Sequence, residues 1–91
     1  MNTLRKSFFD HLAQTSDTPP ALEIKSAKGV YLYGANKKYL DLISGIAVSN
    51  LGHGNKKIIG AIKKQLDLHA HLMVYGEFIL SPQTEYAELL T

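Results

Sequence analysis

The residues best suited to chemistry in this 91-residue chain lie in and around one loop, "SGIAVSNLGHGN", residues 44–55. Its glycines allow positive φ angles or close approach of the backbone to a ligand, and loops of this kind often serve a binding site. His53 stands between two of these glycines and invites a catalytic or metal-binding role. A lone histidine just before a predicted helix more simply anchors its loop by a hydrogen bond, and we expect that role.

Other features that could do chemistry are weak. The run "GHGNKK", residues 52–57, lacks the third glycine of the dinucleotide motif and the Gly-Lys-Ser/Thr ending of the phosphate loop. His69 and His71 are spaced for one face of a strand, with no third ligand near, and we expect them to be structural or exposed. The chain has no cysteine, which excludes disulfides, thiolate zinc sites and cysteine nucleophiles. We therefore expect no metal site.

Composition indicates one small domain with a modest core. The hydrophobic share of 45% and charged share of 20% are those of a globular protein, and no apolar run reaches the length of about 18 residues that a membrane span needs. With a net charge of +2 and lysine pairs scattered between glycine turns, we expect neither nucleic acid nor membrane as a partner. The N-terminus resembles no signal peptide, so we expect a cytoplasmic protein.

The elements that must position the loop begin with a helix over residues 1–15, indicated by Leu4, Phe8 and Leu12 and ended by the prolines at 19 and 20. Period-two patterning then predicts a three-stranded antiparallel meander over residues 22–43. Its strands are expected at 22–25, 30–33 and 39–42, with a tight turn at 34–37. The glycine loop, 44–54, follows the meander.

Two more helices are predicted after the loop. The first covers residues 55–70 with Asn55 as its N-cap, and the second covers residues 82–91, with Ser81 as its cap and Pro82 in its first turn. The second helix would break off directly after its apolar face, which suggests a piece of something longer. The fold class expected for the chain is α+β.

The run "GVYLYGANKKYLDLISGIAVSNLGHGNKKIIGAIKKQL", followed by "VYGEFILSPQ", resembles the N-terminal portion of the class III pyridoxal-phosphate aminotransferases. The most specific stretches are "YLDL", "GIAV" and "NLGH", in order and at family spacing. The chain departs from the family pattern at Ala35-Asn36-Lys37, where an aspartate-glycine turn is common, and at Asn55-Lys56, where histidine-proline is usual. Asparagine suits both a turn and an N-cap, so the departures bear on the subfamily.

The resemblance implies a fold-type-I enzyme, α/β when complete, with pyridoxal 5'-phosphate as cofactor. In that family the aldimine lysine, the carboxylate on the pyridine nitrogen and the phosphate cup come from a large domain later in the sequence, which is absent here. We therefore name no catalytic and no cofactor-binding residue and expect the chain alone to be inactive. Asp41 could stand in for the pyridine partner, but on an apolar strand a solvent-facing or turn-capping role is expected.

The resemblance also implies substrate-binding residues: Ser44, Gly45, Ile46 and Tyr75. Ile46 would shape the pocket around the amino donor, and the region of Tyr75 would lie near the active site and dimer interface. From the residues alone, Ile46 and Val48 would rather be core residues beneath the meander, and core packing is an equal alternative for Tyr75.

The implied reaction moves an amino group between an amino acid or ω-amine and a 2-oxo acid. The implied partners are these small molecules, the large domain and a second subunit in a homodimer. Two alternatives stay open. One is an aminomutase of the same family, and the other is an autonomous small α+β module that binds a partner through its tyrosines and lysine pairs.

Overall fold

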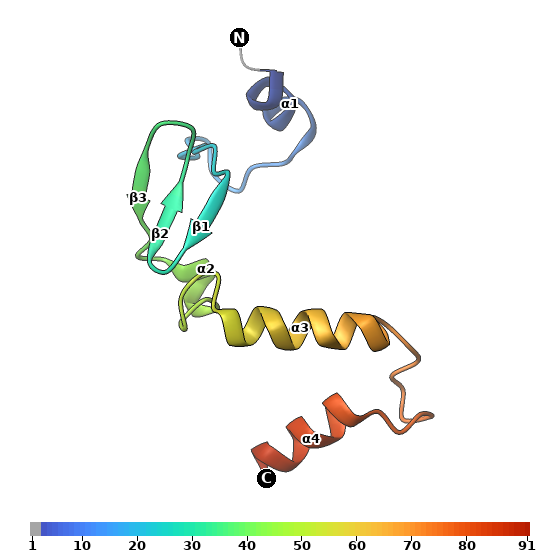
Figure 1. The fold of residues 1–91 in the computed structure, drawn as a ribbon. Coiled ribbons are helices and arrows are strands. Elements are labelled where there is room, and N and C mark those ends of the chain that lie inside the picture. Colours follow the sequence, from blue (N-terminus) through green and yellow to red (C-terminus); the bar gives the residue numbers. More distant parts are fainter. Residues whose placement is uncertain (1–2) are drawn as a thin grey trace. The chain divides into compact units, whose positions relative to one another are not determined.

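The computed structural model describes residues 3–91, which form a small α+β arrangement of helices and one three-stranded antiparallel sheet (Figure 1). The α+β class and the meander expected from the sequence are thereby confirmed. The chain divides into two compact units, one up to Ile59 and the other from Gly60 onward. Helix α3, Lys56–Leu68, begins in the first unit and continues in the second.

The sheet consists of β1 (Ser26–Lys28), β2 (Tyr31–Tyr33) and β3 (Lys38–Leu40), in the order β1-β2-β3. Leu32 lies opposite Ala27 on one side and Tyr39 on the other. The predicted turn between β2 and β3 is confirmed by the hydrogen bond from the Gly34 N–H to the Lys37 carbonyl, 2.8 Å. Tight turns thus keep the meander in register.

Two of the expected strand positions are wrong. The first strand is Ser26–Lys28 rather than residues 22–25, which run irregularly beside the first helix and line a groove with it. The third strand ends at Leu40 rather than at residue 42. It ends there because the Asp41 side chain accepts hydrogen bonds from the next backbone amides and bends the chain away from the sheet.

Helix α1 covers Thr3–His11, whereas residues 1–15 were expected, and residues 1–2 lie outside the described part. Local side-chain bonds replace the helix after His11. The Gln14 amide donates to the Leu12 carbonyl, and Ser16 Oγ accepts from the Thr18 N–H.

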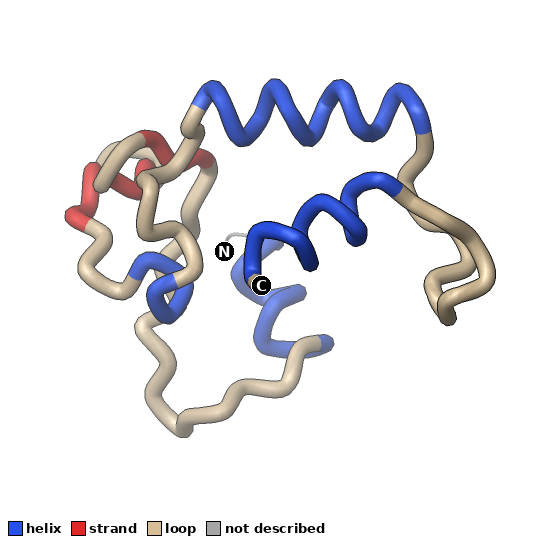
Figure 2. Tube along the Cα trace, turned by 90° about the horizontal axis from the view of Figure 1, so that it is seen from below, coloured by secondary structure: helices blue, strands red, loops and turns tan. Residues whose placement is uncertain are grey.

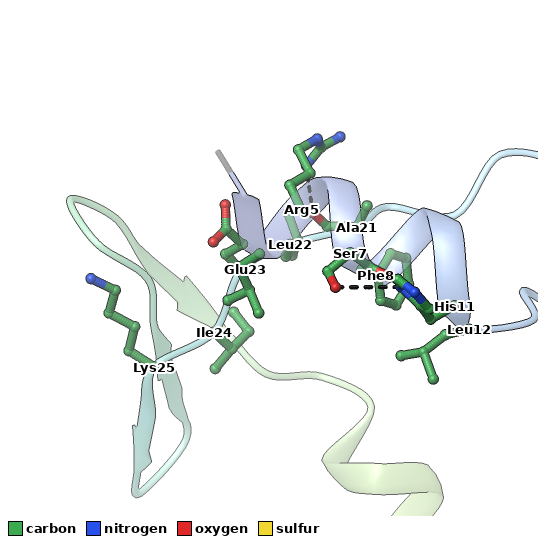
Figure 3. Close-up of a pocket in the computed structure, with 11 residues that line it drawn as sticks. Arg5, Ser7, Phe8, His11, Leu12, Ala21, Leu22, Glu23, Ile24 and Lys25 are labelled. Atoms are coloured by element: carbon green, nitrogen blue, oxygen red, sulfur yellow. Dashed lines mark hydrogen bonds between the residues drawn. The ribbon is translucent and has the colours of Figure 1, made fainter. Parts of the chain in front are cut away.

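The groove between α1 and residues 21–25 has a volume of about 460 Å³ (Figure 3). The Arg5 guanidinium donates to the Ala21 carbonyl at 3.0 Å and so ties the two walls together. Most of the remaining lining is apolar, contributed by Leu4, Phe8, Leu12, Leu22 and Ile24.

Helix α3 begins where the sequence indicates. Asn55 Oδ1 accepts hydrogen bonds from the Lys57 and Ile58 amides at 3.0 and 3.2 Å, which confirms the predicted N-cap. The helix ends at Leu68 rather than at residue 70.

Helix α4 covers Ser81–Leu90 and follows the irregular segment 69–80, drawn as a continuous loop in Figure 2. The predicted serine cap is wrong, because Leu80 occupies the N-cap position with no side-chain cap bond. The helix is started instead by Pro82 in its first turn and by Thr84, whose Oγ1 donates to the Leu80 carbonyl at 2.9 Å.

None of residues 3–91 is buried. The apolar faces of α1, α3 and α4 are open, as are most apolar side chains of the glycine loop. No helix within residues 3–91 is long and apolar enough to cross a membrane.

Candidate functional site

The centre of the candidate site is a single left-handed helical turn, α2, Ser44–Ala47. The φ angles of its four residues are 54°, 60°, 61° and 65° in chain order. A left-handed conformation costs about 1–2 kcal/mol for each residue other than glycine, and it is a genuine outlier for a β-branched residue such as Ile46. Strain of this kind persists only where the surroundings hold it, and it clusters at functional sites.

Glycines were expected to take positive φ in this loop, and Gly45, Gly52 and Gly54 do so at 60°, 87° and 70°. The positive φ angles of the three non-glycine residues of the turn, Ser44, Ile46 and Ala47, were not predicted. Nothing in a serine, an isoleucine or an alanine indicates a left-handed backbone, so this part of the site could be found only in the structure.

Hydrogen bonds from both sides hold the turn. Asp41 Oδ1 accepts from the Ile43 and Ser44 amides, at 3.1 and 2.9 Å. Further along, the Ala47 N–H donates to the Ile43 carbonyl at 3.1 Å, and the Ser49 N–H donates to the Ser44 carbonyl at 2.8 Å. The Asp41 carboxylate therefore caps the start of the turn, which confirms its expected capping role.

The other oxygen of the same carboxylate binds His53. Asp41 Oδ2 lies 2.5 Å from His53 Nε2, and because a carboxylate oxygen only accepts, Nε2 carries the proton. Exposed fractions of 8% for the aspartate side chain and 21% for the histidine side chain show that both are largely shielded. The predicted anchoring role of His53 is confirmed, and its partner, twelve residues away, is the residue that the sequence did not indicate.

The pKa of Asp41 is lowered below its ordinary value of 3.8, chiefly by the hydrogen bond from His53 and next by that from the Ser44 amide. Partial desolvation opposes this effect, and the Ile43 amide and the charge of His53 add to it. Asp41 is therefore held as a carboxylate, the form that can accept three hydrogen bonds at once.

The turn between β1 and β2 positions both members of the pair (Figure 1). Gly29 exchanges two backbone hydrogen bonds with His53, each 2.8 Å long, and the Val30 carbonyl accepts from the Asp41 N–H at 2.8 Å. Two neighbouring residues of one β-turn thus fix the two ends of the segment that contains α2.

The structure brings together three of the four predicted substrate-binding residues, Ser44, Gly45 and Ile46, on this one turn. The Ile46 side chain is 86% exposed, so the alternative of a core residue beneath the meander is wrong for residues 3–91. Tyr75 is 87% exposed and lies on the loop of the second unit.

All lysines within residues 3–91 are exposed, and Lys6 pairs with Asp10 on its own helix. Residues 3–91 also contain no cluster of three or more histidine, cysteine, aspartate or glutamate side chains that could hold a metal ion.

His69 and His71 have no part in the turn. His69 is half-buried beside Gln65, whose side-chain amide lies 3.3 Å from the His69 Nε2 and donates to the His69 carbonyl, and His71 is exposed. The structural and exposed roles expected for them are confirmed.

The family described as "Aminotransferase class-III" matches residues 12–91. An acetylornithine aminotransferase of Bacillus amyloliquefaciens is 54% identical over 52 residues, which cover 56% of this chain and 23% of that protein. A protein of the same name from Archaeoglobus fulgidus is 37% identical over 82 residues, 89% of this chain and 21% of its own length.

A third relative has a different name. The adenosylmethionine-8-amino-7-oxononanoate aminotransferase of Staphylococcus aureus is 42% identical over 71 residues, 77% of this chain and 16% of that protein. The chain thus spans between 16% and 23% of the lengths of these three relatives. The match over residues 12–91 shows that the chain belongs to the class III aminotransferase family.

Proposed function

We propose that this chain supplies one wall of the substrate pocket of a class III aminotransferase, which moves an amino group between an amino acid or ω-amine and a 2-oxo acid. The observation that carries the proposal is the α2 turn, where Ile46 is exposed although its backbone is strained. An apolar side chain in that state gains nothing for this chain's own stability, so a contact with another molecule or domain is its best explanation.

Pyridoxal 5'-phosphate is the proposed cofactor of the whole protein, and when bound it supplies the electron sink of the reaction. We assign its binding groups to the large domain, because every lysine within residues 3–91 is exposed. The role of Ser44, Gly45 and Ile46 is then one of fit: they bound the space that the donor chain occupies. Tyr75 is proposed as a second wall residue, near the interface of a homodimer.

Acetylornithine is the first donor to test, because two of the relatives described above carry that name, and S-adenosylmethionine is the second. An aminomutase is distinguished by its products, since it needs no 2-oxo acid as acceptor. An autonomous binding module is not favoured, because a chain with no buried residue among 3–91 is poorly suited to fold alone.

The test is Ile46→Ala in the full-length enzyme, with Val48→Ala as the matched control on the next exposed β-branched residue. Each methylene fitted or excluded is worth about 1–3 kcal/mol, so the ratio of kcat/KM between long and short donors should change at least about tenfold. Affinity for the cofactor should stay unchanged, and Val48→Ala should leave the ratio alone. An equal loss for all donors would overturn the proposal.

A second measurement uses the 91-residue chain mixed with pyridoxal phosphate. Exposed lysines form only weak aldimines, which dialysis removes, so no absorbance band of an enclosed aldimine should remain. A band that survives dialysis at one equivalent would place the cofactor site in this chain and contradict its assignment to the large domain.

A further inference from the structure

We propose that Asp41 and His53 act together as a positioning pair, which locks the left-handed turn Ser44–Ala47 in the conformation that serves the substrate pocket. The inference rests on the proposed function of the turn and adds to it two residues that do not touch the substrate. It explains how residues 3–91, none of which is buried, hold a strained turn.

The first step compares the backbone strain of the turn with the contacts that hold it. Three of its residues, Ser44, Ile46 and Ala47, adopt a left-handed conformation that is unfavourable for residues with a Cβ atom and that glycine adopts freely. No residue among 3–91 is buried, so packing does not hold the turn within this chain. Polar contacts must therefore hold it, and those at its start converge on Asp41.

The second step is the orientation of Asp41. Its Oδ1 can face the Ile43 and Ser44 amides only while the carboxylate is kept in one rotamer, and His53 on Oδ2 keeps it there at 2.5 Å. The imidazole is itself held, because the backbone of His53 pairs on both sides with Gly29. The β1–β2 turn therefore positions His53, His53 orients the Asp41 carboxylate, and the carboxylate holds the start of α2.

The experiment uses the full-length protein and two variants of the histidine. His53→Ala removes the contact, whereas His53→Gln keeps a nitrogen donor at a similar reach. In His53→Ala the amides of Ile43 and Ser44 should exchange with deuterium about tenfold faster, as expected for the loss of hydrogen bonds to a charged group, and His53→Gln should recover part of the protection. His71→Ala, an exposed histidine without a part in the site, is the matched control.

A double-mutant cycle tests whether the two residues act as one device. Asp41→Asn combined with His53→Ala should loosen the turn no more than the stronger single variant does, because both break the same contact. The Ile59 amide, bonded to the Asn55 carbonyl in α3, reports whether each variant remains folded. The pair would be overturned if the exchange rates in His53→Ala stay within about twofold of those in the unchanged protein. It would also be overturned if the rate increases of the two single variants multiply in the double variant.

Donor selectivity measured on the same variants separates this inference from the proposed function. We expect His53→Ala to raise KM more than it lowers kcat, and to shift the donor ratio in the direction of Ile46→Ala. A turn that loosens while Ile46→Ala leaves the donor ratio unchanged would overturn the proposed function and support the pair as the lock of the turn. If amide exchange is unchanged in His53→Ala while Ile46→Ala alters the donor ratio, the pair would be overturned and the proposed function supported.

Discussion

At the scale of single residues, the ionisation of Asp41 controls the start of the turn. Its pKa is lowered, so its pairing stabilises the folded chain fully above the ordinary value of 3.8, and that stabilisation is lost as the pH falls through the lowered pKa. The carboxyl ¹³C shift of Asp41, followed by NMR, should therefore titrate below 3.8. In His53→Ala the midpoint should rise, and in His71→Ala it should not. A midpoint that His53→Ala leaves in place would assign the shift to the backbone amides alone.

Ile46 offers a second prediction at this scale. Because φ is 61° and the side chain is 86% exposed, Ile46→Gly should remove backbone strain and lose little burial. We expect the turn to become more stable by about 1 kcal/mol, measured as the free energy of local opening from exchange of the Ala47 and Ser49 amides.

Val48→Gly is the control for Ile46→Gly. Val48 is similarly exposed but has a φ of −73°, so glycine should cost about 0.5–1 kcal/mol there. If both variants destabilise the turn, then Ile46 contributes contacts that offset its strain. If the stabilised Ile46→Gly enzyme also discriminates donors poorly, the strain is maintained for function.

At the scale of elements, two glycines should respond to alanine in opposite directions. Gly29 has a φ of 60° in the β1–β2 turn, whose backbone bonds His53 through Gly29 and Asp41 through Val30, so Gly29→Ala should cost about 1–2 kcal/mol and speed amide exchange at His53. Gly60 lies inside α3 with open space around it and an ordinary φ, so Gly60→Ala should stabilise that helix by about 1 kcal/mol. Equal effects of the two substitutions would mean that the β1–β2 turn tolerates another conformation.

The elements also show how far the sequence alone could lead. Periodicity predicted the helices and the meander, and Asn55 marked the start of α3, because these signals are local. The position of β1 was missed because the alternating residues 22–25 line a groove with α1 instead of forming a strand. Sequence patterns do not encode that arrangement. The end of β3 depends on local hydrogen bonds to the Asp41 side chain, whereas the lock of α2 also depends on the contact of Asp41 with His53, which is distant in the sequence.

At the scale of the whole molecule, the apolar faces of the helices need another part of a protein to bury them. The apolar stripes of its three main helices are open, and an amphipathic helix owes most of its stability to burial of that stripe. The chain spans less than a quarter of each of the three relatives described above, so in an enzyme of that length the large domain and the second subunit are the proposed covers.

The 91-residue chain studied alone should therefore associate with itself. Exposed apolar patches larger than a few hundred Å² are uncommon on stable monomers, and the stripe of α3, made of Ile58, Ile62 and Leu66, can pair with its own copy across a two-fold axis. Sedimentation over a micromolar concentration series should show a dimer or larger species that grows with concentration. Ile62→Lys should weaken that association by placing a charge within the stripe, whereas Lys63→Gln, on the polar side of the same helix, should not. A folded monomer at every concentration would mean that the chain covers its own apolar faces in solution, and would favour an autonomous module over a pocket wall that needs the rest of an enzyme.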